Sequence, residues 1–149
     1  MPANQDFKDL FALFNKEHVE YLVVGAHAVI YYAEPRYTKD LDIWINPTKA
    51  NAIRVMKALE KFGAPLENVT VDDFTDPEKI FQIGIAPNRI DILMGIAGVD
   101  FATAFDKKTT SAYDELPIFI IGKQELIISK KTVARPQDLL DIERLESQL

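Results

Sequence analysis

Two aspartates lie one residue apart in the stretch RYTKDLDIWI, Arg36 to Ile45, which otherwise has the composition of a buried strand. Because side chains alternate between the two faces of a strand, Asp40 and Asp42 point the same way, about 7 Å apart along it. Carboxylates held on one face repel each other unless a cation lies between them, and Mg²⁺ prefers oxygen ligands. The pattern therefore predicts a divalent metal site on one face of this strand.

A third aspartate, Asp91, interrupts a second apolar run, RIDILM. If the two strands are neighbours in one sheet, three carboxylates would hold metal ions and orient a hydroxyl for in-line attack on a phosphoryl group. Simpler explanations are a solvated strand face and an Asp91 that pairs with Arg89. An aspartate nucleophile of the phosphatase type is excluded, because in that motif the apolar strand precedes the first aspartate, whereas here polar residues precede it.

The bulk composition is typical of one globular domain over residues 1–149. Of these residues, 48% are hydrophobic and 27% charged, which is sufficient for a buried core. The formal net charge of −6 argues against a broad, sequence-independent grip on nucleic acid. The longest apolar run, Tyr21 to Ala33, is too short to cross a bilayer, no secretory signal is evident and the chain has no cysteine. We therefore expect a cytoplasmic protein without membrane attachment.

Hydrophobic periodicity, caps and breakers predict helices interleaved with strands. The expected helices are 6–16, 26–32, 49–62, 100–105, 123–130 and 136–149, and the expected strands are 21–24, 41–45, 80–85, 89–94 and 116–121, with a hairpin turn at 86–88. In the third helix, Ala52, Ile53, Met56 and Leu59 form the expected apolar stripe. This order indicates an α/β or α+β fold with a mixed sheet, on which the C-terminal helices, about 123–149, pack.

The order of the motifs resembles that of the DNA polymerase β-type nucleotidyltransferase superfamily. The segments GAHAVIYYAEPRYTKDLDIWI, FQIGIAPNRIDIL and KKTVARPQDLLDI are similar to those of small bacterial and archaeal nucleotidyltransferase-like proteins related to the abortive-infection toxin group. The resemblance spans about Tyr21 to Leu145, and the ordered set is specific although each motif alone is weak. It implies a nucleotidyltransferase fold, a mixed β-sheet flanked by helices.

The resemblance also implies roles for single residues. Asp40, Asp42 and Asp91 match the metal-binding and catalytic carboxylates, with Asp91 as the base that activates the acceptor hydroxyl. Gly25 and Ala26 match the phosphate-binding turn, where glycine lets the backbone approach a phosphate at a helix N-terminus. The family usually has Gly or Ser at the second position, so Ala26 keeps the backbone donor but not a serine hydroxyl.

Four further residues have two interpretations each. Arg36 and Thr38 either orient phosphates or brace the loop before the aspartate pair. Lys130 matches a family lysine that can reach a triphosphate, with Lys131 as a substitute, and the alternative is a solvated helix face.

Two other features of the motifs favour structural roles. Arg135 with Asp138 and Asp141 is interpreted as a set of structural salt bridges. His27, on the first turn of a short helix, is interpreted as a core or capping residue.

Together these residues predict a metal-dependent nucleotidyltransferase. It would move a nucleoside monophosphate from a Mg²⁺-bound nucleoside triphosphate such as ATP, with Mn²⁺ as a substitute metal, to a hydroxyl acceptor and release pyrophosphate. The acceptor stays open between an RNA end, a protein and a small molecule. The alternative is a non-catalytic nucleotide- or partner-binding module of a toxin–antitoxin-like system. A homo-oligomer or a complex with a partner protein is compatible with either function.

Overall fold

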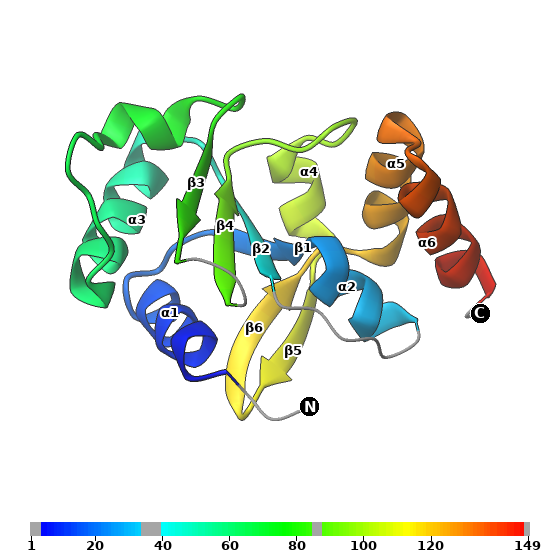
Figure 1. The fold of residues 1–149 in the computed structure, drawn as a ribbon, viewed down its shortest axis with the longest axis horizontal. Coiled ribbons are helices and arrows are strands. Elements are labelled where there is room, and N and C mark those ends of the chain that lie inside the picture. The colour runs from blue at the N-terminus through cyan, green and yellow to red at the C-terminus, as the bar shows by residue number, and fades with distance from the viewer. Residues whose placement is uncertain (1–3, 34–39, 85–87, 148–149) are drawn as a thin grey trace.

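The computed structural model describes residues 4–33, 40–84 and 88–147, which form a mixed sheet with helices packed against it (Figure 1). The strands are β1 (Tyr21–Val24), β2 (Asp40–Ile45), β3 (Ile80–Ile83), β4 (Arg89–Leu93), β5 (Thr109–Tyr113) and β6 (Leu116–Ile120). The helices are α1 (Gln5–Lys16), α2 (Gly25–Tyr32), α3 (Lys49–Phe62), the 3₁₀-helix η1 (Val71–Thr75), α4 (Phe101–Asp106), α5 (Lys123–Val133) and α6 (Pro136–Ser147). The predicted fold class, a mixed sheet flanked by helices, is confirmed.

The six strands have the order β3-β4-β2-β1-β6-β5. The centre of the sheet combines both pairing types, because β2 is antiparallel to β1 but parallel to β4. Two hairpins, β3–β4 and β5–β6, form the outer parts. In the parallel pair, Asp42 is the register partner of Asp91. The topology therefore places both aspartates on one face of the sheet.

The opposite face of the sheet is apolar and packs on α1 and α3. Leu41, Ile43 and Ile45 alternate with the aspartates along β2 and are buried. Tyr21, the register partner of Ile45, packs its ring against Phe14 of α1 with a centroid distance of 5.6 Å. This packing fixes the register of β2, since a shift by one residue would turn Asp40 and Asp42 into the core.

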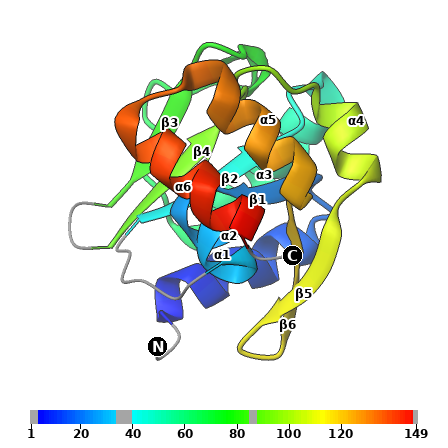
Figure 2. The same cartoon turned by 90° about the vertical axis from the view of Figure 1, so that its right-hand side faces the viewer.

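The aspartate-bearing face is covered by α4 and by the C-terminal helices. Trp44 of β2 meets Phe101 of α4 edge to face, with ring centroids 4.9 Å apart. In both views α5 and α6 lie side by side as a pair (Figures 1 and 2). The short helix α2 contacts both β2 and α6. Within the described ranges, none of the helices is long and apolar enough to span a bilayer.

The helix α3 has a different buried stripe from the predicted one. Ile53 is 51% exposed, whereas Val55 and Leu59 are fully buried. The phase of the helix is set at its start by Asn51, a fully buried polar residue. The prediction for Ile53 was wrong because the apolar residues of α3 allow two overlapping stripes, and the protein buries the one that contains Val55 and Ala58.

The predicted elements otherwise agree with the structure to within a few residues, with two omissions. The strand β5 and the 3₁₀-helix η1 were not predicted, and α5 continues to Val133 rather than ending at Lys130. The strands β3 and β4 end at Ile83 and Leu93, short of the predicted 85 and 94. The predicted turn at 86–88 falls mostly outside the described residues.

The side chain of Asn51 joins three segments of the chain through hydrogen bonds. Its Oδ1 accepts a hydrogen bond from the backbone N–H of Glu20 at 2.8 Å, and its Nδ2 donates to the carbonyls of Glu20 at 3.0 Å and of Asn46 at 2.9 Å. The start of β1, the end of β2 and the start of α3 are thereby joined through one side chain.

We predict that Asn51→Asp lowers the free energy of unfolding by about 3–5 kcal/mol. The substitution keeps the shape but places a carboxylate oxygen against two carbonyl oxygens, with no water to solvate it. Urea denaturation measures the change. Asn68→Asp, at an exposed position, is the control and should stay within about 0.5 kcal/mol of the original. Equal stabilities of the two variants would contradict the account of Asn51.

Candidate active site

The parallel pairing of β2 and β4 brings two of the predicted carboxylates together. Asp42 and Asp91 are register partners, and their carboxyl groups lie within hydrogen-bonding reach of each other. Asp91 is only 9% exposed, so water screens its charge poorly. Asp40 lies on the same face, two residues before Asp42 on β2, and its side chain is 43% exposed. The structure therefore groups all three predicted aspartates on one face of the sheet.

Arg89 lies among these carboxylates. It precedes Asp91 by two residues and so projects from the same face of β4. Its Nε is 3.0 Å from Oδ1 of Asp91 and its Nη2 is 3.2 Å from Oδ2 of the same residue. The same Nη2 reaches Oδ2 of Asp40 at 3.5 Å. The simpler sequence interpretation, an Asp91 that pairs with Arg89, is thus realised together with the cluster rather than instead of it.

Asp42 has the most strongly perturbed acidity in the cluster. Burial, followed by the negative charges of Asp91 and Asp40, raises the pKa of Asp42 to about 6. The positive charge of Arg89 lowers it but does not offset the other effects. An ionised Asp42 is therefore energetically unfavourable in the protein alone, and binding of a cation beside it would be favoured.

The oxygen donors on this face of the sheet suit Mg²⁺, although not as three converging carboxylates. Among residues 4–33, 40–84 and 88–147, no group of three His, Cys, Asp or Glu side chains is arranged to hold a metal ion. Asp40 points to the Arg89 guanidinium instead. Asp42 and Asp91 remain as two adjacent hard oxygen donors whose charges repel, which is the chemistry that a hard divalent cation relieves.

The glycine predicted to bind phosphate lies directly against Asp42. Gly25 has φ +65°, and a Cβ built on it would be 2.9 Å from Cγ of Asp42 and closer still to its Oδ2. Only glycine fits both this backbone conformation and this contact. Gly25 begins α2, and Ala26 follows in its first turn, so their backbone amides lie at a helix N-terminus beside the carboxylate pair. Arg36 and Thr38 lie outside the described residues.

A cleft of about 190 Å³ runs between this face of the sheet and the C-terminal helices. Gly25 and Asp42 form one wall. Lys130 and Arg135 belong to the other wall, which the α5–α6 pair provides. The remaining lining residues are Val24, Leu93, Ile96, Leu126, Ser129, Val133 and Asp138. The cleft therefore places the carboxylate of Asp42 opposite the cationic side chains of Lys130 and Arg135, which come from a distant part of the sequence.

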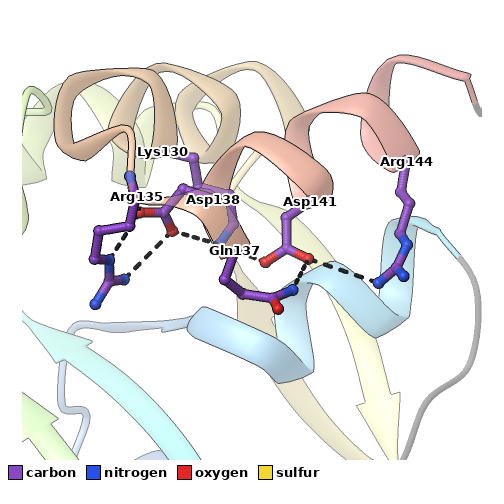
Figure 3. A network of polar contacts seen from close by, with 6 residues as sticks. All are labelled: Lys130, Arg135, Gln137, Asp138, Asp141 and Arg144. Atoms are coloured by element: carbon purple, nitrogen blue, oxygen red, sulfur yellow. Dashed lines mark hydrogen bonds and ion pairs between the residues drawn. The ribbon is translucent and has the colours of Figure 1, made fainter.

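Lys130 belongs to a buried polar network on the cation wall. Its Nζ is 3.1 Å from Oδ2 of Asp141 and 3.6 Å from Oδ1 of Asp138, and its side chain is 12% exposed (Figure 3). The alternative of a solvated helix face is therefore wrong. Arg135 forms the expected salt bridge to Asp138, with 2.8 Å between Nε and Oδ2. The contact of Lys130 with a triphosphate stays a prediction.

His27 is half-buried beside the site. Its ring meets Phe7 edge to face, with centroids 5.7 Å apart, and burial lowers its pKa. This agrees with its interpretation as a core residue.

With the geometry established, comparison with solved structures defines the class of fold. The chain is similar to the lincomycin-bound lincosamide antibiotic adenylyltransferase LnuA, at 18% identity and a TM-score of 0.60, with 100% of both chains covered. It is also similar to TM1012 of Thermotoga maritima, a protein proposed to be a nucleotidyltransferase, at 13% identity and a TM-score of 0.61, covering 96% of this chain and 91% of that one.

A third similar structure is the solution structure of the antibiotic-resistance factor ANT(2'')-Ia, at 12% identity and a TM-score of 0.56, covering 95% of this chain and 79% of that one. No protein-family model matches the sequence. No curated protein sequence matches it either. The chain therefore has the fold of these nucleotidyltransferases, and its relation to the abortive-infection toxin group stays a prediction.

Two cationic residues near the aspartates, Arg89 and Arg135, were not among the site residues predicted from the sequence. A pairing of Asp91 with Arg89 is an alternative to the carboxylate cluster on the sequence alone, although the Arg89-x-Asp91 spacing already places both side chains on one strand face. Arg135 was treated as purely structural, yet it lines the cleft. No sequence signal shows that the α5–α6 turn faces Gly25, because that contact depends on the tertiary packing of α5 and α6.

We predict that Asp42→Asn raises stability in a pH-dependent way. Between about pH 4 and pH 6 the folded protein retains a proton on Asp42 that the unfolded chain has lost, so the stability of the original protein falls as pH rises through this window. Asn cannot ionise and avoids this loss. The variant should exceed the original by about 2–3 kcal/mol near pH 7.5 and by much less near pH 4.5.

Chemical denaturation across this pH range measures the difference. Asp106→Asn, at an exposed position, is the control that should show no such growth with pH. A variant less stable than the original at neutral pH would mean that Asp42 is a structural ion-pair partner, contrary to this account.

We predict that Gly25→Ala is more destabilising than Gly63→Ala. Both glycines have positive φ, +65° and +88°, so both substitutions cost about 1–2 kcal/mol of backbone strain. A Cβ at Gly63 meets nothing within 4 Å, whereas one at Gly25 collides with Asp42. The additional loss at Gly25 should be about 1–3 kcal/mol in urea denaturation. Equal losses would show that Gly25 does not lie against Asp42.

Proposed function

We propose that this protein transfers a nucleoside monophosphate from a Mg²⁺-bound nucleoside triphosphate to a hydroxyl group and releases pyrophosphate. The observation that carries the proposal is the adjacent pair Asp42 and Asp91, of which Asp42 lines the cleft and whose mutual repulsion a divalent cation would relieve. The fold shared with an adenylyltransferase supports it.

Each wall of the cleft has a function in the proposed reaction. Asp42 and Asp91 would hold Mg²⁺, which supplies a positive charge that neutralises the phosphates and the leaving pyrophosphate. The amides of Gly25 and Ala26, at the N-terminus of α2, donate hydrogen bonds to phosphate oxygens. The cationic wall on α5 and α6 balances the charge of the triphosphate.

Asp91 is the proposed base. As the acceptor oxygen attacks the α-phosphorus, the carboxylate takes the hydroxyl proton. The bond between the acceptor oxygen and the α-phosphorus forms while the bond from that phosphorus to the pyrophosphate oxygen breaks. Arg89, which holds both oxygens of Asp91, fixes the orientation of the carboxylate for this transfer.

We further propose that the acceptor is a small hydroxylated molecule rather than a long nucleic acid. The net charge of −6 disfavours an extended polyanion. The similar structure LnuA is a lincosamide adenylyltransferase with lincomycin bound, which shows that this fold accommodates an acceptor of that size in that protein. The non-catalytic alternative predicts nucleotide binding without pyrophosphate release.

We predict that the protein, incubated with Mg²⁺, α-labelled nucleoside triphosphates and a small-molecule extract of cells, transfers label to a small molecule and releases pyrophosphate. Asp91→Asn should reduce the rate at least about 100-fold through loss of the base. Asp106→Asn is the control and should retain the original rate. Nucleotide binding without pyrophosphate release, for all four triphosphates, would refute the enzymatic proposal and favour the binding module.

A further inference from the structure

The two cations of the cleft have very different surroundings. The ammonium of Lys130 lies against two carboxylates, Asp138 and Asp141, whose side chains are 3% and 2% exposed. The guanidinium of Arg135 has a single carboxylate partner among the described residues, and its side chain is 72% exposed. Both residues line the same cleft as Gly25 and Asp42. They therefore differ in how available they are to a ligand.

The ammonium of Lys130 is engaged in ion pairs within the protein. Asp138 and Asp141 are buried anions, and removing a cation that pairs with a buried anion is strongly destabilising. The three groups join α5 to α6, as Figure 3 shows, and Gln137 and Arg144 add further contacts to Asp141 at 2.9 Å and 3.9 Å. A phosphate that bound Lys130 would break the ion pairs of Lys130 with Asp138 and Asp141, and the binding free energy would have to offset that loss.

Arg135 is held in place by hydrogen bonds that use only part of the donor capacity of its guanidinium. Its Nε donates to Oδ2 of Asp138 at 2.8 Å and its Nη2 donates to Oδ1 at 3.3 Å, so the guanidinium is held by two hydrogen bonds. A guanidinium has five N–H donors, and these bonds occupy two of them. In Figure 3 the side chain projects from the α5–α6 turn, away from the body of the network. Three donors of a pre-positioned fork thus remain for a ligand in the cleft.

The charge of the cleft wall formed by α5 and α6 also favours an anion at this place. Among the side chains that line this wall, Lys130 and Arg135 contribute two positive charges and Asp138 one negative charge, which leaves an excess of one positive charge. This excess lies in a chain whose net charge is −6. A planar guanidinium is suited to bidentate contacts with phosphate oxygens.

We propose that Arg135 is the residue that binds the terminal phosphates of the nucleoside triphosphate, and that Lys130 is a structural residue that holds α5 against α6. This inference rests on the proposed nucleotidyl transfer. Asp138 acts through Arg135 as a positioning residue, because it fixes the plane of the guanidinium opposite Gly25 and Asp42. The assignment reverses the roles that the sequence motif suggests for the two cations.

Binding of inorganic tripolyphosphate and of Mg²⁺ with a non-hydrolysable nucleoside triphosphate, measured by calorimetry, tests the proposal. We expect Arg135→Ala to weaken both affinities at least about tenfold and to reduce the dependence of binding on salt. Arg135→Lys should recover part of the affinity, since it keeps the charge without the fork. Arg135→Gln covers the case in which the alanine variant does not fold.

Arg144→Ala is the matched control. It removes the same side chain from the same network, 3.9 Å from Asp141, but Arg144 does not line the cleft. Its affinities should equal those of the original protein. Lys130→Met should lower the midpoint of thermal unfolding far more than Arg135→Ala does, because it removes the buried cation that pairs with both Asp138 and Asp141.

The outcomes separate this inference from the proposed function. If the original protein binds the nucleotide and transfers it, but Arg135→Ala and Arg135→Gln bind as tightly as the original, the assignment of Arg135 is wrong and the proposed function stands. If the original protein binds neither tripolyphosphate nor nucleotide, the proposed function fails and this inference fails with it.

Discussion

The repulsion between Asp42 and Asp91 is the constraint on which the rest of the site depends. Parallel pairing of β2 with β4 fixes the two carboxylates side by side, and burial prevents water from separating their charges. Burial, followed by the negative charges of Asp91 and Asp40, raises the pKa of Asp42 to about 6. Without a bound cation, the neighbouring negative charges destabilise the folded protein, and a cation that bound beside them would reduce the repulsion. Arg89 already reduces part of it, because its guanidinium pairs with Asp40 and Asp91.

The remaining structure positions this pair and encloses it. The apolar face of β2 packs on α1 and α3, so the register cannot shift without burying the aspartates. Gly25 allows the backbone of the β1–α2 turn to approach Asp42, where a larger residue would collide. On the other side the α5–α6 pair is held by buried ion pairs and presents its turn to the cleft. Anionic and cationic walls, from segments far apart in sequence, thereby face each other.

Much of this arrangement could be predicted from local patterns. Alternation along DLDIWI and RIDIL placed the aspartates on strand faces, and the order of helices and strands gave the mixed sheet. The strand β5 escaped prediction because it is polar and its turn uses Asp114 and Glu115 at positive φ, instead of the usual Asn-Gly or Gly-containing signal. The phase of α3 was not predicted because its apolar residues allow two overlapping stripes, and only tertiary packing shows that Val55 rather than Ile53 is buried. The different exposure of Lys130 and Arg135 was not predicted because both belong to one motif, and only tertiary packing distinguishes the buried cation from the exposed one.

The measurement that tests the central claim most directly is a side-chain carboxyl ¹³C NMR titration of the aspartates, with and without Mg²⁺ and a non-hydrolysable nucleoside triphosphate. Without ligand, Asp42 should titrate near a pKa of about 6. With Mg²⁺ and nucleotide its pKa should fall well below that value, and the Asp91 resonance should shift together with it. An Asp42 that titrates in the ordinary aspartate range, and does not respond to Mg²⁺ with nucleotide, would contradict the account.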